Sequence, residues 1–72
     1  MIIVSVFDSK LGEFNGCQAF PNEAVAFRSW LNFLRTVNEN DKDDYQFFKL
    51  GELDVVSGEI TRCPPRVVGG VS

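Results

Sequence analysis

The fold is decided by one stretch of the chain, Asp43-Asp44-Tyr45-Gln46-Phe47-Phe48-Lys49-Leu50-Gly51-Glu52-Leu53-Asp54-Val55-Val56-Ser57-Gly58-Glu59-Ile60. Its first half, from Tyr45 to Leu53, is rich in aromatic and aliphatic residues, which favour a strand. Asp54 and Ser57-Gly58 supply turn chemistry, because glycine takes positive φ without strain. The alternation of side chains resumes from Glu59 to Cys63, and we expect Pro64-Pro65 to end this returning strand. The stretch therefore predicts a β-hairpin.

Polarity does not distinguish the two faces of the first hairpin strand. Because side chains alternate along a strand, Phe48 and Leu50 share one face, whereas Tyr45 and Phe47 share the other. Both faces carry large apolar side chains, so we expect both to be covered at least in part. Gly51, in the middle of the run, predicts a bulge or a close approach of two backbones.

The rest of the chain supplies partner strands and one helix. Residues 1–7 are nearly all apolar, as expected of a central strand covered on both faces. Residues 17–20 predict a short second strand, and Asn22 is the expected N-cap of a helix that extends to about Asn38. The order β-β-α-β-β predicts the α+β class: a small antiparallel sheet with one amphipathic helix packed on one face.

Composition indicates one folded domain. The 72 residues are 44% hydrophobic and include seven phenylalanines, which argues against disorder. We expect residues 1–63 to form a single compact α+β domain and residues 64–72 an extended C-terminal tail. No basic leader or long apolar segment is present, which predicts a soluble protein without a membrane partner. Cys17 and Cys63 are expected to be reduced, partly buried thiols rather than a disulfide.

The predicted helix carries an unusually wide apolar face. Its apolar side chains span an arc of roughly 160°, compared with about 100° for a core-facing stripe. The excess lies at Phe27, Leu31 and Phe33. Neighbouring loops can cover these side chains, or they can form the interface of a homodimer, since exposed apolar patches mark interfaces.

No arrangement of residues for catalysis is found. Histidine is absent, which removes the commonest general base and metal ligand. The serines lack a base partner, and no phosphate-binding loop occurs. The acidic segment at residues 39–44 matches no calcium loop and is interpreted as a solvated connection. We therefore expect no enzyme activity, no cofactor and no metal site.

Nucleic-acid binding is the remaining chemical hypothesis. The net charge of -3 argues against a polybasic binder but leaves room for a local patch. Tyr45, Phe47 and Lys49 share one strand face, and an aromatic surface with a cation is typical of single-strand binding. Alternatively, Tyr45 and Phe47 pack against the tail or a second subunit. The candidate phosphate contacts are Lys10, Arg28, Arg35, Lys49, Arg62 and Arg66.

A succession of short motifs resembles a known viral family. The motifs are Val6-Phe7-Asp8-Ser9-Lys10, Ala26-Phe27-Arg28-Ser29-Trp30, Asp43-Asp44-Tyr45 through Leu50-Gly51, and Asp54 with Ser57-Gly58-Glu59. In this order the chain resembles the small nonstructural protein of gokushoviruses, which are single-stranded DNA phages of the Microviridae. The resemblance covers roughly residues 4–60, and its final segment is the specific part. The chain departs from the family pattern at Ala19-Phe20-Pro21 and in its tail.

The resemblance implies a phage protein of the host cytoplasm that is absent from the mature virion. Members of that family are regarded as DNA-binding or as factors that turn replication towards single-stranded genomes. No catalytic residues carry over, and Lys10 and Arg28 are the matching positions with functional potential. The leading hypothesis is a homodimer that binds single-stranded DNA during genome replication or packaging. The alternative is an adaptor that binds a phage replication, capsid or host protein.

Overall fold

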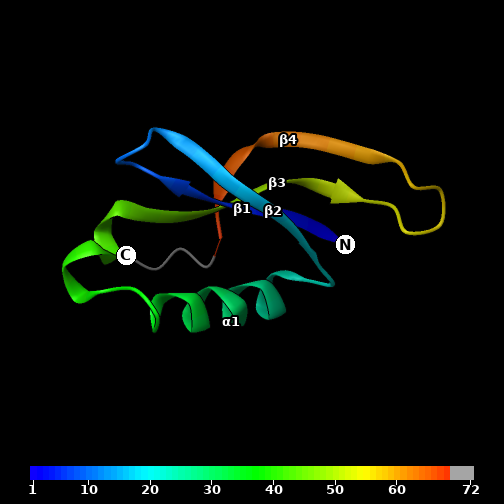
Figure 1. Ribbon diagram of the computed structural model, residues 1–72. Coiled ribbons are helices and arrows are strands. Elements are labelled where there is room, and N and C mark those ends of the chain that lie inside the picture. Colours follow the sequence, from blue (N-terminus) through cyan, green and yellow to red (C-terminus); the bar gives the residue numbers. More distant parts are fainter. Residues whose placement is uncertain (69–72) are drawn as a thin grey trace.

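The computed structural model describes residues 1–68 as a four-stranded antiparallel sheet with one α-helix (Figure 1). The elements are β1 (Ile2–Asp8), β2 (Glu13–Phe20), α1 (Glu23–Leu34), the 3₁₀ helix η1 (Glu39–Asp44), β3 (Tyr45–Leu53) and β4 (Ile60–Val67). The strand order in the sheet is β2-β1-β3-β4. The predicted class and the predicted order of strands and helix are confirmed.

The helix covers one face of the sheet, and the core lies between them. Figure 1 shows α1 running alongside the sheet on one side. Ile2, Val4 and Phe47 pack there against Ala26 and Trp30. The rings of Trp30 and Phe47 stack with centroids 5.1 Å apart and planes only 5° from parallel. This stack joins the helix to the centre of the sheet.

The start of the helix follows the prediction, but its end does not. The Asn22 side chain accepts a hydrogen bond from the Val25 N–H, as expected of an N-cap. The helix ends at Leu34 rather than near Asn38. Thr36 Oγ1 donates to the Phe33 carbonyl over 2.7 Å, and Thr36 and Val37 are β-branched residues that favour a helix less. The acidic segment that follows, expected to be a solvated connection, forms the 3₁₀ helix η1, which has no buried residues.

The second strand is longer than its sequence suggested. It begins at Glu13, because a tight turn connects it to β1: the Asp8 carboxylate accepts from the Lys10 and Leu11 N–H groups, and Gly12 has φ 70°. Gly16, with φ 74°, lies where the pairing of β1 with β2 changes register. A glycine at a bulge takes this conformation without strain.

The last strand passes through the two prolines, which corrects the prediction that Pro64-Pro65 would end it. The pairing of β3 with β4 changes register between Lys49 and Gly51 and continues to Val67. The prolines are tolerated here because residues 63–65 lie at this register shift, where no β3 residue pairs with them, and because β4 is an edge strand. Residues 64–67, expected in the tail, therefore extend the sheet.

The segment after β4 returns to the core. The Val68 side chain is 2% exposed, and its N–H donates to the Phe47 carbonyl over 2.9 Å. Residues 69–72 of the expected tail lie outside the described residues. Gly51 meets the prediction of a close approach, because a Cβ added there would lie 2.5 Å from the Thr61 carbonyl oxygen. The compact part of the chain thus reaches at least Val68.

Candidate nucleic-acid interface on the open face of the sheet

Strand pairing separates the side chains that face the helix from those that face away. Val6 pairs with Phe47 on the helix side, so the neighbouring pair of Ser5 with Phe48 points to the other side. We call the side away from α1 the open face. By the same pairing it carries Ile3, Ser5, Phe7, Phe14, Gln46, Phe48, Arg62 and Val67, and Leu50 lines a hollow on this side.

Three aromatic rings meet on the open face, one from each of β1, β2 and β3. The centroid distances are 5.1 Å for Phe7–Phe14, 5.6 Å for Phe14–Phe48 and 6.4 Å for Phe7–Phe48. All three contacts are edge-to-face, an arrangement that stabilises aromatic pairs. We call these residues the phenylalanine cluster. Phe14 is its most exposed member, at 43%.

A hollow lies beside the phenylalanine cluster. It has a volume of about 590 Å³, and its lining residues come from β2, β3 and β4: Phe14, Leu50, Arg62, Cys63, Pro64 and Pro65. Arg62 has no carboxylate within ion-pair distance among residues 1–68. The hollow thus combines apolar walls, one aromatic ring and one unpaired guanidinium.

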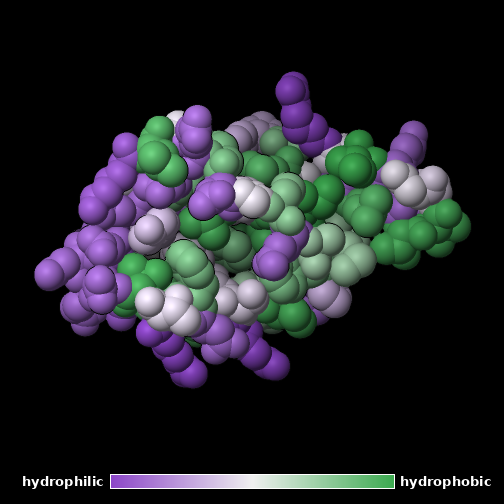
Figure 2. Space-filling view, in the orientation of Figure 1, coloured by the Kyte–Doolittle hydropathy of each residue, from purple (hydrophilic) through white to green (hydrophobic). Residues whose placement is uncertain are grey.

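Negative charge is kept away from this face. The carboxylates within the strands are those of Asp8, Glu13 and Glu52, and all three are paired with helix-side positions. Four more acidic residues lie in η1, at the hydrophilic end of the molecule in Figure 2. The open face therefore carries no strand carboxylate and one positive group, although the whole chain has a net charge of -3.

Three of the predicted phosphate contacts are paired with carboxylates instead. Lys10 lies 3.2 Å from Asp44 and 3.4 Å from Asp41, and its hydrogen bond to Asp44 is the main reason its pKa is raised. Lys49 lies on the helix side, 14% exposed, 3.6 Å from Glu52. Arg66 Nη2 lies 3.0 Å from the Glu23 carboxylate. These cations do not form one basic groove.

Two further predicted contacts lie on the helix. Arg28 and Arg35 are exposed on α1 and at its C-terminal cap, on the side of the sheet opposite to the open face. Neither forms an ion pair within the described residues. Of the six predicted cations, Arg62 alone lies on the open face.

The predicted aromatic platform belongs to the covered side of the sheet. Phe47 is 6% exposed and stacks on Trp30, so it is a core residue. Tyr45 packs against the core and meets Phe33 edge-to-face at 5.5 Å. The structure therefore packs both predicted rings against the helix side, and the rings on the opposite face of the sheet are those of the phenylalanine cluster. The alternation of side chains along β3 predicts that Phe47 and Phe48 lie on opposite faces of the sheet. It does not predict which of these faces the helix covers.

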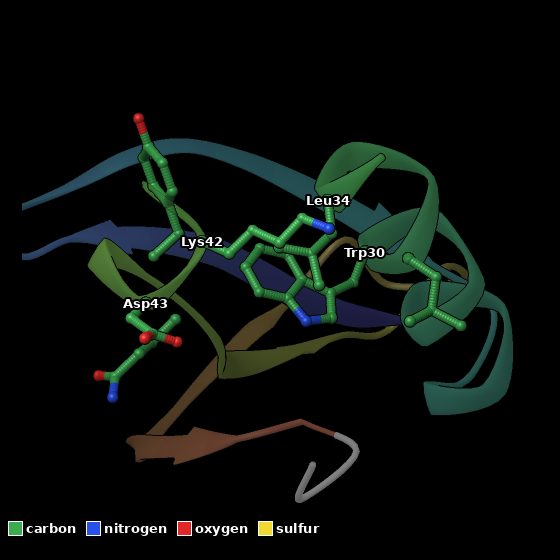
Figure 3. Close-up of a pocket in the computed structure, with 7 residues that line it drawn as sticks. Trp30, Leu34, Lys42 and Asp43 are labelled. Atoms are coloured by element: carbon green, nitrogen blue, oxygen red, sulfur yellow. The ribbon is translucent and has the colours of Figure 1, made fainter. Parts of the chain in front are cut away.

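A second hollow, shown in Figure 3, lies between α1, η1 and β3. Its volume is about 430 Å³, and its walls include Trp30, Leu34 and Tyr45 together with Lys42 and Asp43. Lys42 is already paired with Glu39 at 3.1 Å. This hollow therefore combines apolar walls with the Asp43 carboxylate, which has no ion-pair partner among residues 1–68.

The helix side chains expected to form a dimer interface differ in exposure. Leu31 and Phe33 are exposed, whereas Phe27 is half-buried against the core.

Both cysteines are free thiols as predicted, although Cys17 is exposed rather than partly buried. Among residues 1–68, no helix has the length and apolar character needed to cross a membrane.

Comparison with known proteins gives a family match. The sequence model of a family described as Phage ORF5 protein matches residues 1–72. No curated protein and no solved structure matches the chain. The family match includes every strand and helix described above, and so both faces of the sheet.

Proposed function

The chain belongs to the Phage ORF5 protein family, and on that premise we propose that it binds single-stranded DNA through the open face of its sheet. The observation that carries this proposal is the phenylalanine cluster beside the unpaired Arg62, on a face without strand carboxylates. Single-strand binders combine aromatic rings that stack on bases with cations that contact the backbone. By analogy, one class of RNA-binding domain also stacks bases on aromatic residues of a four-stranded sheet.

Few phosphate contacts are available to this surface. The net charge of -3 repels DNA at a distance, and Arg62 is the cation beside the cluster. Each phosphate contact to a single strand contributes a slope of about -0.7 to the dependence of log affinity on log salt. We therefore expect a shallow salt dependence, with most of the affinity coming from base stacking.

The family match supports a phage protein. We propose that the relationship is to the nonstructural proteins of gokushoviruses, as the motifs around Asp43 to Gly51 suggest. The protein would then act in the host cytoplasm during genome replication or packaging and be absent from the mature virion. We also propose a homodimer that buries the exposed Leu31 and Phe33 of α1.

The test is a titration of the protein against labelled oligothymidylate at low and at physiological salt, with duplex DNA as the control. We expect binding that prefers the single strand. Replacing Arg62 by Gln should lower the affinity and reduce the salt slope, whereas Arg28→Gln, on the covered side, should change neither. If the wild-type protein does not bind the oligonucleotide at low salt, the proposal is wrong.

The adaptor function remains the second candidate because of the tip of the β3–β4 hairpin. Val56 is 93% exposed, and Val55 and Ile60 are also exposed. Figure 2 shows apolar residues gathered at the hairpin end of the molecule. Exposed apolar patches mark protein contacts. This function predicts capture of a phage or host protein that Val56→Asp abolishes, in a chain that does not bind DNA.

A further inference from the structure

The geometry of the phenylalanine cluster limits how many bases it can hold. The planes of its rings meet at 65° for Phe7–Phe14, 79° for Phe14–Phe48 and 87° for Phe7–Phe48. A base stacks only on a ring that lies parallel to it. Because the three planes are close to mutually perpendicular, a base that stacks on one ring meets the edges of the other two.

Phe14 is the ring with access to a ligand. It is the most exposed of the three, at 43%, whereas Phe7 and Phe48 are half-buried. It is also the member of the cluster that lines the hollow of about 590 Å³. Phe7 and Phe48 instead support Phe14 through edge-to-face contacts.

The rest of the hollow suits one nucleotide. Its volume falls within the roughly 300–1,000 Å³ of small-ligand sites. Leu50, Pro64 and Pro65 supply apolar walls, and Arg62 supplies a guanidinium that is free of carboxylate partners among residues 1–68. A guanidinium matches the geometry of a phosphate group.

We infer that each protein molecule holds one unpaired base at a time, stacked on Phe14 in this hollow, with an adjoining phosphate at Arg62. This inference rests on the proposed single-strand binding and sharpens it. The ligand is a single extruded nucleotide of a flexible strand, not a run of stacked bases. Duplex DNA is excluded because its base faces are occupied by neighbouring bases.

The experiment compares alanine variants of the three rings against oligothymidylate. Loss of one base stack corresponds to about a 5- to 150-fold weaker affinity. We expect that loss for Phe14→Ala and a smaller one for Phe7→Ala and Phe48→Ala, which leave the stacking ring in place. Val25→Ala, an exposed apolar position on the helix, serves as the control and should bind as the wild type.

A second variant, Phe14→Trp, should keep its affinity and give a direct signal. The introduced indole would be quenched by the stacked base, while the fluorescence of the buried Trp30 in the wild-type protein would not change. If the wild type binds but Phe14→Ala binds equally well and the introduced indole is not quenched, the single-base inference is wrong and the proposed function stands. If the wild type does not bind the oligonucleotide at all, both the single-base inference and the proposed function are wrong.

Discussion

The two faces of this sheet are built from the same residue type and differ in what covers them. Phe47 and Phe48 are neighbours in sequence, yet Phe47 lies under Trp30 and Phe48 lies in the phenylalanine cluster on the open face. The covered side also carries the strand carboxylates, one of which, Glu52, pairs with Lys49, and the pair of Arg66 with Glu23 of the helix. The difference shows that aromatic content does not define a binding surface. A ring becomes available for binding only when no other part of the chain packs over it.

The contrast between Phe47 and Phe48 is the comparison with the largest expected effect. Phe47→Ala opens a cavity beneath Trp30 and should lower the free energy of unfolding by about 3–5 kcal/mol. This is a large part of the stability of so short a chain. Phe48→Ala removes a half-buried ring and should cost less than half as much. Urea denaturation measures the free energy of unfolding of both variants. Equal losses would show that Phe48 contributes as much to stability as Phe47 does.

Gly51 of β3 lies where the backbones of β3 and β4 approach each other closely. A methyl group there would lie 2.5 Å from the Thr61 carbonyl oxygen, so Gly51→Ala must shift β4 or β3. We expect a loss of about 1–3 kcal/mol, as for other overpacked sites. Because β4 carries Arg62 and the prolines of the hollow, the affinity for oligothymidylate should fall as well. Gly12→Ala, at the turn after β1, is a control for loss of stability alone: its φ of 70° strains an added side chain, but nothing lies within 4 Å of the added Cβ. A loss of stability in Gly12→Ala without a loss of binding would separate the two effects.

Replacing Asn22, the N-cap of α1, tests whether the helix contributes to stability alone or also to DNA binding. Its side chain caps α1 through a 2.9 Å hydrogen bond from the Val25 N–H. Asn22→Ala should therefore cost about 1 kcal/mol of stability, and Asn22→Asp should restore it. Thermal unfolding measures both changes. DNA affinity should stay as in the wild type, because the helix does not contribute to the open face; a fall in affinity would argue against the assigned interface.

Asp54 lies at the hairpin turn, beyond both faces, and should give the smallest effect. Hydrogen bonds from the Val56 and Ser57 N–H groups lower the pKa of its carboxyl below the ordinary value. A lowered pKa in the folded state means that the carboxylate stabilises the fold at neutral pH, and that this contribution is lost as the pH falls through the folded pKa. Asp54→Ala should flatten the acid side of the stability profile. Chemical denaturation at pH 7 and at successively lower pH tests this, and an unchanged slope would contradict it.

Much of the fold was predictable, because it depends on local patterns. The hairpin from Tyr45 onward, the N-cap at Asn22 and the apolar first strand all follow from residue types and their spacing. The length of β4 did not follow, since tolerance of Pro64-Pro65 depends on β4 being an edge strand. The strand order is a long-range property that no short stretch of sequence determines.

The candidate site was less predictable, for the same reason. Arg62 was identified as a candidate phosphate contact. Lys10 and Arg66 are paired with carboxylates far away in the sequence, whereas Lys49 is paired with Glu52, three residues further along β3. The alternation along β3 separated Phe47 from Phe48 correctly. Deciding which of them would be exposed required the position of α1, which is set by packing and not by the strand itself.

The two edges of the sheet have a consequence for how the protein behaves at high concentration. An exposed strand edge is a template on which further chains can add and grow into fibrils. Here both edges are interrupted: Pro64-Pro65 remove two donors from β4, and the Gly16 bulge bends β2. Growth of the sheet by addition of strands is therefore disfavoured at both ends. The molecule can expose an apolar sheet face to a ligand without also offering an uninterrupted edge for aggregation.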